Sequence, residues 1–209
     1  MEILAPLTVP LFIAVGMPMS VGDILGFITG VICVWLTARA NVWNFPSGIL
    51  NSVFLGLVFF QHRLFAEAGL QIVFIVLSVM GWLQWLYQHH ARESSPVFSS
   101  SAREQVILIA IAILMTLLLW QLLLWLKGAA PPIDALITAL SLCAQWQINR
   151  RQLSNWAWWI LVDVISIPLY WNRDLPLIAA LYVLFLLICL RGWWNWRRLA
   201  QPRLAEAAI

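Results

Sequence analysis

Long apolar runs separated by short polar segments make up most of this chain. From Val21 onward these runs have the length of membrane-spanning helices, because about 20 apolar residues are needed to cross the hydrocarbon core of a bilayer. The pattern predicts seven such helices, at residues 22–38, 45–61, 66–86, 105–126, 133–149, 156–172 and 175–194. Most of the loops between them are a handful of residues long, so consecutive helices are expected to be antiparallel neighbours.

One stretch of sequence occurs twice. The frame Gly-Trp-x-x-Trp at residues 81–85 returns 111 residues later at residues 192–196, and an ungapped alignment of residues 23–85 with 134–196 gives 15 identical positions of 63. The identities include uncommon residue types: Asp23 with Asp134, Trp35 with Trp146, Arg39 with Arg150, Asn44 with Asn155, and Phe74 with Phe185. Self-similarity at a fixed offset indicates an internal duplication. The chain is therefore predicted to contain two three-helix units.

The helix at 105–126 has no counterpart at this offset and is predicted to be a lipid-facing spacer. A single helix between the units returns the chain across the membrane, so both units start on the same side and the repeats are parallel. The predicted fold class is an all-α integral membrane protein with seven transmembrane helices in a 3+1+3 parallel repeat. The expected divisions are an N-terminal apolar segment, the first unit, a linker with the spacer helix, the second unit and a tail, at residues 1–20, 21–87, 88–132, 133–198 and 199–209.

The apolar run at residues 3–17 is too short to span, and prolines interrupt it, so it is expected to lie at the membrane interface. A signal peptide is disfavoured because no Lys or Arg precedes the run.

Composition supports a bilayer protein and excludes several other classes. Residues are 63% hydrophobic and 10% charged, and the mean hydropathy is +0.88, far from the range of soluble domains. The three cysteines lie inside apolar runs, which indicates packing and neither a disulfide framework nor a metal site. Basic residues are spread over helix ends without forming a tract, so no nucleic-acid partner is expected.

The distribution of Lys and Arg predicts the orientation. With the first helix starting outside, eight arginines lie on the inner side and three basic residues on the outer side, which places the C-terminus in the cytoplasm. The inner set is Arg39, Arg92, Arg103, Arg150, Arg151, Arg197, Arg198 and Arg203, and the outer set is Arg63, Lys127 and Arg173.

The chain shows no hydrolase triad, zinc-protease motif, nucleotide-binding loop or dinucleotide fingerprint, and its three histidines, His62, His89 and His90, are expected in loops. No enzymatic activity, cofactor or metal is predicted. A membrane scaffold without transport is the remaining bland alternative.

Polar residues inside the spans are the best indication of a site, because a buried polar group in a membrane needs a partner or a cavity. In the sixth span Trp159, Asp163, Ser166 and Tyr170 lie at i, i+4, i+7 and i+11, on one helix face. Asp163 is the only acidic residue well inside a span. Two interpretations stay open for it: a packing carboxyl bonded to a neighbouring amide or hydroxyl, or a substrate contact.

The third and seventh spans carry equivalent polar and aromatic faces. The third has Gln71, Trp82 and Trp85, and the seventh has Tyr182, Phe185, Cys189, Trp193 and Trp196. With Asn51 of the second span, these faces predict one cavity between the units. Of the two tryptophans in each repeated frame, one is expected to pack or stack in the site and the other to anchor the helix end at the membrane interface.

Several of these motifs resemble the PnuC family of bacterial nicotinamide riboside transporters over residues 22–198. The resemblance rests on Asn155-Trp156, Asp163 to Ser166, Tyr170, Leu181-Tyr182 and Gly192, together with Trp43 to Phe45, Gly48, Asn51, Leu64, Gln71 and the frame at 81–85. It implies a fold like that of full-length SWEET sugar transporters and uptake of nicotinamide riboside across the inner membrane by facilitated diffusion. Relatives that carry other vitamins such as thiamine leave the solute open, and a homo-oligomer such as a trimer is also among the expectations.

The substrate-binding residues predicted from the helix faces and the resemblance are Asn51, Gln71, Trp82, Trp85, Asn155, Trp159, Asp163, Ser166, Tyr170, Tyr182 and Trp193. Nicotinamide riboside carries a cationic pyridinium ring, a carboxamide and ribose hydroxyls, which aromatic faces, amides and a carboxylate can recognise. A phosphate is expected to be excluded, because no Arg or Lys lies in the predicted cavity to neutralise it.

Overall fold

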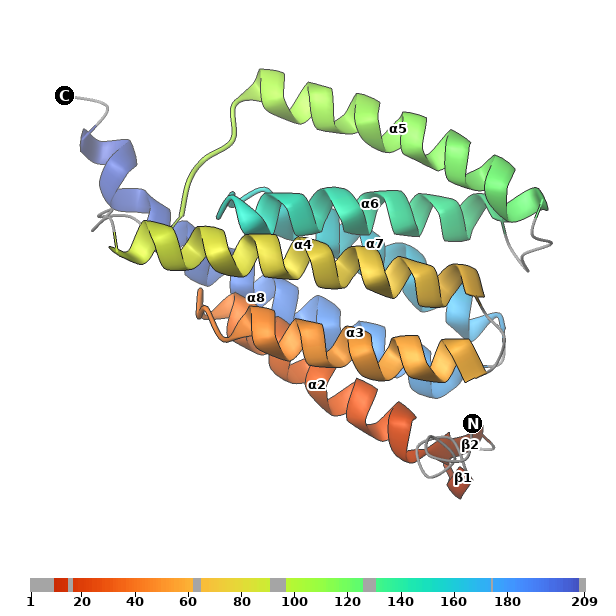
Figure 1. The fold of residues 1–209 in the computed structure, drawn as a ribbon. Helices are drawn as coiled ribbons and strands as arrows, with labels where there is room; N and C mark the ends of the chain where they lie inside the picture. Colours follow the sequence, from red (N-terminus) through yellow and green to blue (C-terminus); the bar gives the residue numbers. More distant parts are fainter. Residues whose placement is uncertain are drawn as a thin grey trace.

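The computed structural model describes residues 10–14, 17–61, 65–90, 97–125, 131–173 and 175–206, and helices dominate it (Figure 1). The described residues form seven helices, one in each predicted region: α2 (Val21–Ala38), α3 (Asn44–Gln61), α4 (Phe65–His90), α5 (Ala102–Trp125), α6 (Pro131–Asn149), α7 (Asn155–Trp171) and α8 (Pro176–Glu206). The helical class is therefore confirmed, and most helix ends agree with the prediction to within three residues.

Two helices run past their predicted ends. α4 continues to His90, so His89 and His90, predicted in a loop, are its last two residues, whereas His62 lies outside the described residues. α8 continues to Glu206, so most of the predicted tail is helical. The prediction followed the apolar run, which marks the membrane boundary. Arg, Leu, Ala, Gln and Glu, which prevail beyond that boundary in α8, are strong helix formers, so the helix has no reason to stop there.

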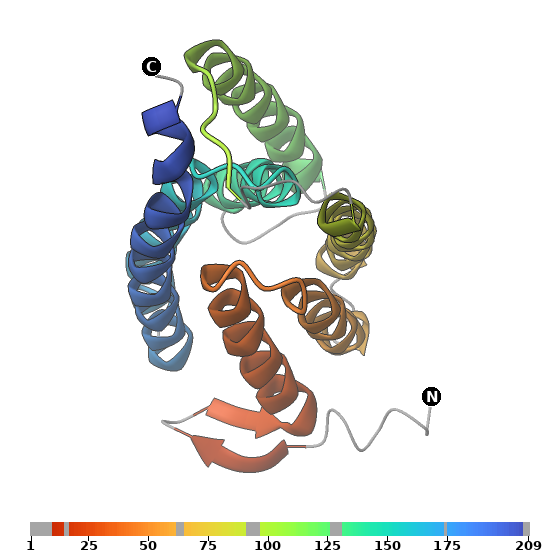
Figure 2. The ribbon, with the colours of Figure 1, turned by 90° about the vertical axis from the view of Figure 1, so that its left-hand side faces the viewer.

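A short hairpin precedes the helices and was not predicted. β1 (Pro10–Ala14) pairs antiparallel with β2 (Met17–Ser20), and Figure 2 shows the pair against the start of α2. Prolines disfavour a helix here and tolerate an extended chain. Ser20 then caps α2: its Oγ accepts from the Asp23 N–H at 3.2 Å, and the Asp23 carboxylate accepts from the Ser20 N–H at 3.0 Å. Residues 1–9 of the predicted interfacial segment lie outside the described residues.

Within the described residues, four helical segments are long and apolar enough to cross a bilayer: Val21–Ala38, Ala68–Tyr87, Ala102–Trp125 and Pro176–Ala200. Asn44–Phe60 in α3 is apolar but shorter. α7 has 17 residues, and α6 carries polar residues along much of its length. Because several of its helices can cross a bilayer, the chain is a multi-pass membrane protein.

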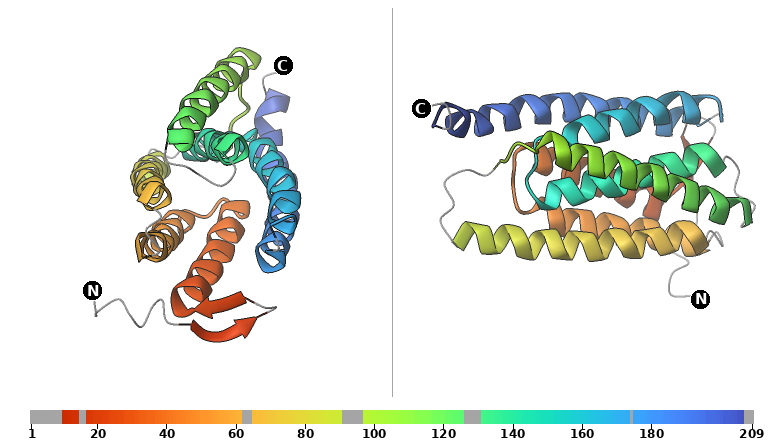
Figure 3. Two further views of the ribbon diagram at one scale, coloured as in Figure 1. Left: turned by 90° about the vertical axis from the view of Figure 1, so that its right-hand side faces the viewer. Right: turned by 90° about the horizontal axis from the view of Figure 1, so that it is seen from above.

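Six of the helices form a ring. Each packs against the next in the order α2, α3, α4, α6, α7, α8, and α8 returns to α2. The spacer α5 packs on α6 from outside the ring, as the end-on view in Figure 3 shows. Most of the large aliphatic side chains of α5 are exposed, as expected for a helix that faces lipid.

The turns that follow α2 and α6 have the same geometry. Ala40 and Arg151, 111 residues apart, both adopt the left-handed backbone conformation, with φ of 51° and 53°. Their N–H groups bond to the carbonyls three residues earlier at 2.9 Å in both turns. Asn44 and Asn155 then donate side-chain hydrogen bonds to the carbonyls of Asn41 and Gln152, at 2.7 and 2.6 Å.

The segment before α5 is docked on the second of these turns. The Phe98 N–H donates to the Arg151 carbonyl and the Leu153 N–H donates to the Phe98 carbonyl, both at 2.9 Å, which makes a short parallel bridge. At the start of α5, Gln105 bonds to Gln147 and Ser154 at 3.2 and 3.0 Å. The start of the spacer is therefore held against α6 and α7.

Candidate functional site

Three buried polar groups line one face of α7, and the residues that carry them, Trp159, Asp163 and Ser166, are here called the α7 stripe. Asp163 and Ser166 are 2% and 0% exposed, and Trp159 lies one turn before Asp163. Asp163 Oδ2, Ser166 Oγ and the Trp159 indole N–H have no partner in the described chain by strict hydrogen-bond geometry, although the Tyr182 hydroxyl lies close to Ser166. An unsatisfied buried polar group costs about 1–3 kcal/mol. Other such atoms lie between residues 147 and 156, but these three lie further along α7 with Tyr182 beside Asp163 and Ser166, which makes them the candidate contacts for a polar solute.

Side chains of helix α8 pack against this face of α7. Cys189 lies within hydrogen-bonding reach of Asp163, and Tyr182 lies beside Asp163 and Ser166. The Tyr170 and Tyr182 rings stack with centroids 5.2 Å apart and planes at 15°, and Phe185 meets Tyr182 edge-on at 6.0 Å. The structure thus brings together Trp159, Asp163, Ser166, Tyr170 and Tyr182, all predicted from helical spacing. Cys189 and Phe185 lie on the same face of α8 as Tyr182 but were not among the predicted substrate contacts.

Asn51 of α3, in the first predicted unit, is hydrogen-bonded to α2. The Asn51 amide donates to the Gly26 carbonyl at 2.6 Å and to Thr29 Oγ1 at 3.2 Å. A Cβ on Gly30 would lie 3.3 Å from Asn51 Nδ2 and 3.5 Å from Phe185 Cζ, so side chains of α3 and α8 both lie close to the α2 backbone at Gly30. Gln71 packs differently, with its Cβ 3.4 Å from the position a Cβ on Gly56 would take.

The second tryptophan of each repeated frame lies between the two predicted units and not at the lipid interface. Trp85 and Trp196 are 1% and 0% exposed. The Trp85 indole N–H donates to the Ile148 and Asn149 carbonyls, both at 3.1 Å, and the Trp196 indole N–H donates to the Thr37 carbonyl at 2.9 Å. Each indole therefore bonds to carbonyls at the C-terminal end of a helix in the other predicted unit, and the Thr37 and Ile148 carbonyls already accept from the Ala40 and Arg151 N–H groups.

These tryptophans belong to a row of four buried aromatic side chains, here called the aromatic row: Phe45, Trp85, Trp196 and Trp156. Phe45 meets Trp85 edge-on at 5.1 Å, Trp85 lies 6.1 Å from Trp196, and Trp156 meets Trp196 edge-on at 5.5 Å. Phe45 and Trp156 are 111 residues apart, as are Trp85 and Trp196. The row connects α3, α4, α8 and α7 at the end of the ring that is on the left in Figure 1.

The other predicted contacts lie apart from the α7 stripe. Trp82 is partly buried against the aromatic row. Trp193 is 39% exposed and lines a shallow surface hollow with Leu190, Trp194 and Arg197. Asn155 is fully buried at the first position of α7. Their roles as substrate contacts stay predictions.

Sequence reasoning missed the acceptors of the aromatic row, because they are backbone carbonyls of Thr37 and Ile148 and carry no side-chain signal. The one available signal was the repeat itself. Trp85 and Trp196 are equivalent, and so are Thr37 and Ile148. Thr29 was missed as well, since it bonds to its own helix and to Asn51.

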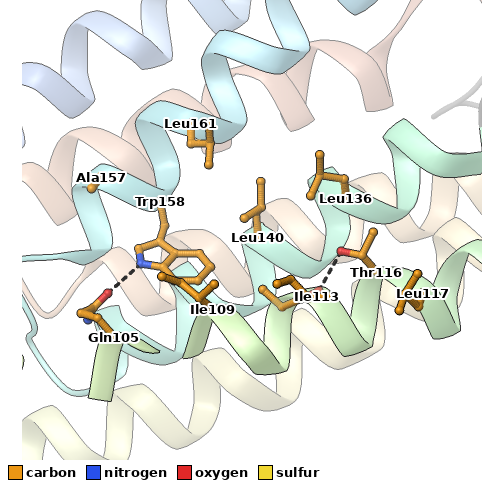
Figure 4. A pocket seen from close by; sticks show the side chains of 11 residues that line it. Gln105, Ile109, Ile113, Thr116, Leu117, Leu136, Leu140, Ala157, Trp158 and Leu161 are labelled. Atoms are coloured by element: carbon orange, nitrogen blue, oxygen red, sulfur yellow. Dashed lines mark hydrogen bonds between the residues drawn. The ribbon is translucent and has the colours of Figure 1, made fainter. Parts of the chain in front are cut away.

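A pocket of about 410 Å³ lies outside the ring between α5, α6 and α7 (Figure 4). Its walls are mostly aliphatic. The Trp158 indole N–H donates to Gln105 Oε1 at 3.1 Å, and the Thr116 hydroxyl donates to the Ala112 carbonyl at 2.7 Å. Since these polar atoms are already bonded within the chain, the pocket offers little to recognise a polar solute, and the α7 stripe is the better candidate.

Comparison with known proteins gives consistent matches. A sequence model of the family described as nicotinamide mononucleotide transporter matches residues 20–198. The nicotinamide riboside transporter PnuC of Escherichia coli (strain K12) is 24% identical over 92% of this chain and 91% of its own length. The riboflavin/roseoflavin transporter RibM of Streptomyces davaonensis is 28% identical over 88% of this chain and 90% of its own.

A solved structure shares the fold. The crystal structure of the vitamin B3 transporter PnuC superposes with a TM-score of 0.69 at 22% identity, covering 85% of this chain and 81% of that one. At this identity the likeness concerns the fold alone.

Proposed function

Because this chain belongs to the nicotinamide mononucleotide transporter family, we propose that it carries nicotinamide riboside across a bacterial inner membrane. The observation that supports nicotinamide riboside as the substrate is the α7 stripe. Asp163, Ser166 and Trp159 present an acceptor, a hydroxyl and a donor without partners beside the stacked Tyr170 and Tyr182. A planar cationic ring with a carboxamide and hydroxyls supplies complementary groups, and aromatic faces attract such a cation by about 0.5–2 kcal/mol.

The proposed architecture is seven spans in a 3+1+3 parallel repeat, with α2–α4 as the first unit, α6–α8 as the second and α5 as spacer. The two matching turns support it, as does the order of helices in the ring, which is unchanged when α2, α3 and α4 are exchanged for α6, α7 and α8. Transport would follow from the units moving against each other about a site between them.

The excess of arginines beside the aromatic row supports a cytoplasmic position for that end and for the C-terminus. Assembly into a trimer stays a prediction.

A flavin is the second candidate substrate, favoured by the 28% identity to RibM. The two candidates differ in charge. The riboside has a positive ring that a buried carboxylate can offset, whereas the flavin ring is neutral and gains nothing from Asp163. Thiamine, another cationic vitamin, is a third solute to test.

We expect purified protein in detergent to bind nicotinamide riboside saturably, with quenching of tryptophan fluorescence. Nicotinamide mononucleotide is expected to bind far more weakly. Its phosphate needs a cation, and Arg173, at the opposite end of α7 from the aromatic row, is already paired with Asp134 at 3.3 Å. Titration calorimetry with the riboside, the mononucleotide, riboflavin and thiamine checks both statements. Saturable binding of riboflavin or thiamine alone would identify that vitamin as the substrate in place of nicotinamide riboside. If none of the four compounds binds, the protein would instead be a membrane scaffold without transport.

Transport is expected to be passive and insensitive to the proton gradient. Asp163 is the only acidic residue well inside a helix of the ring, and the titratable groups that face it are Cys189 and Tyr182. A single carboxylate without a nearby His or second acid makes a poor proton relay. Counterflow in proteoliposomes, with equal pH and then with an imposed gradient, measures this. Accumulation of the riboside above its outside concentration, driven by the gradient, would contradict passive transport.

A further inference from the structure

The two units meet at two joints at the end of the ring that holds the aromatic row. In the α4–α6 joint, Trp85 donates to Ile148 and Asn149, and Asn149 Nδ2 donates to the Leu77 carbonyl at 2.8 Å. In the α2–α8 joint, Trp196 donates to Thr37, and Asn195 Nδ2 donates to the Ala38 carbonyl at 2.8 Å. Each joint therefore has one indole and one amide bonded to backbone carbonyls.

Arg151 breaks this symmetry. Its guanidinium lies 4.5 Å from the Trp85 ring centroid and donates to the Trp85 carbonyl at 3.3 Å. The side chain is largely buried, where charge-assisted and cation–π contacts are stronger than at an exposed site. The repeat equivalent of Arg151 is Ala40, which has the same left-handed backbone but no group that could reach Trp196. Among the described residues, the α4–α6 joint alone has this additional arginine contact.

The chain itself adds a second difference. The segment that follows α4 docks through Phe98 on residues 151–153, beside the α4–α6 joint. Val97 is buried in the same cluster as Trp85. At the α2–α8 joint the bonded residues, Ala38 and Asn195, are 157 positions apart in sequence. Residues 97 and 98 are thus held against the second predicted unit, close to the α4–α6 joint.

We infer that Arg151 is a positioning residue that keeps the α4–α6 joint closed, so that this end of the transporter opens by separation of α2 from α8. The inference rests on the proposed alternating access. The bonds that break on opening are then those from Trp196 to Thr37 and from Asn195 to Ala38, and the α4–α6 joint acts as the hinge.

The test measures both joints with repeat-equivalent spin-label pairs. Arg39→Cys with Arg198→Cys reports on α2–α8, and Arg150→Cys with Tyr87→Cys reports on α4–α6; all four side chains are exposed. Double electron–electron resonance is recorded in lipid nanodiscs with and without nicotinamide riboside, after uptake assays show that the labelled proteins transport. We expect the riboside to add a longer-distance population to the first pair and to leave the second unchanged.

Three further substitutions make the result independent of the substrate. Trp196→Phe removes a bond of the α2–α8 joint and should add the longer population to the first pair without any ligand. Trp85→Phe, its repeat equivalent, should not do so for the second pair while Arg151 is present. Arg151→Ala makes the two turns alike, so its combination with Trp85→Phe should add the longer population to the second pair, as Trp196→Phe alone does for the first.

The outcomes separate the two proposals. If Trp196→Phe lengthens the α2–α8 pair alone in a protein that does not bind nicotinamide riboside, the hinge proposal stands and the proposed substrate is wrong. Equal lengthening of both pairs, lengthening of the α4–α6 pair alone, or no lengthening in any variant would overturn the inference. Asymmetry that persists in Arg151→Ala would overturn the role of Arg151.

Discussion

Gly192→Ala is expected to lower the thermal stability of the protein by about 2–12 °C, one of the two largest effects anticipated here. A Cβ at this position would lie 2.5 Å from Cη2 and Cζ2 of Trp156 and 2.8 Å from its Cζ3. Trp156 is fully buried and packed edge-on against Trp196, so it has no room to yield. Overpacking of a tight core typically costs about 1–3 kcal/mol.

Gly69→Ala is the matched control for that substitution. It also adds one methyl group to a helix, but nothing lies within 4 Å of the new Cβ. Alanine is favoured over glycine in a helix by about 0.5–1 kcal/mol, so this variant should melt at the same temperature or slightly higher. Melting followed by fluorescence-detected size-exclusion chromatography compares the two. Equal melting temperatures would show that the contact between Gly192 and Trp156 is not tight.

The helices could be predicted because their cause is local. Each apolar run is long enough to form a span, and the polar breaks between runs are short, so the number and order of helices follow from the sequence. The helix ends were less accessible. In α8 the membrane boundary and the helix end differ, because Arg197 and the residues after it continue the helix in a polar environment. The hairpin at residues 10–20 was missed, since its prolines exclude a helix without specifying what replaces it.

The α7 stripe could be predicted for the same reason, because positions 159, 163, 166 and 170 share a face on any helix. Contacts between helices were beyond this reasoning. Asn51 and Phe185 both lie close to Gly30 of a third helix, and the indole bonds of Trp85 and Trp196 go to backbone carbonyls. The repeat could show that two positions are equivalent but not which partner each would meet.

Asp163→Asn is expected to weaken binding of nicotinamide riboside about tenfold or more. A hydrogen bond to a charged group contributes about 1.5–3 kcal/mol, compared with about 0.5–1.5 kcal/mol between neutral groups, and a difference of about 1.4 kcal/mol is a factor of ten in affinity. Asn keeps the size of the side chain, so the loss reports on charge. Calorimetry with the purified variant measures it. Asp134→Asn is the control, because it removes an acid that is paired with Arg173 at the start of α6.

The two interpretations of Asp163 predict opposite changes in stability. If its carboxylate awaits a cationic solute, Oδ2 is unpartnered in the empty protein, and a neutral amide is cheaper to bury, so Asp163→Asn should melt at the same temperature or higher while binding falls. If Asp163 only packs against Cys189 and Tyr182, the substitution should lower the melting temperature and leave affinity unchanged. Because binding and melting move in different combinations in the two cases, the pair of measurements distinguishes a substrate contact from a structural carboxyl. A neutral ligand such as riboflavin should bind both forms alike, so a loss of affinity confined to the cationic riboside would identify charge as the property that Asp163 reads.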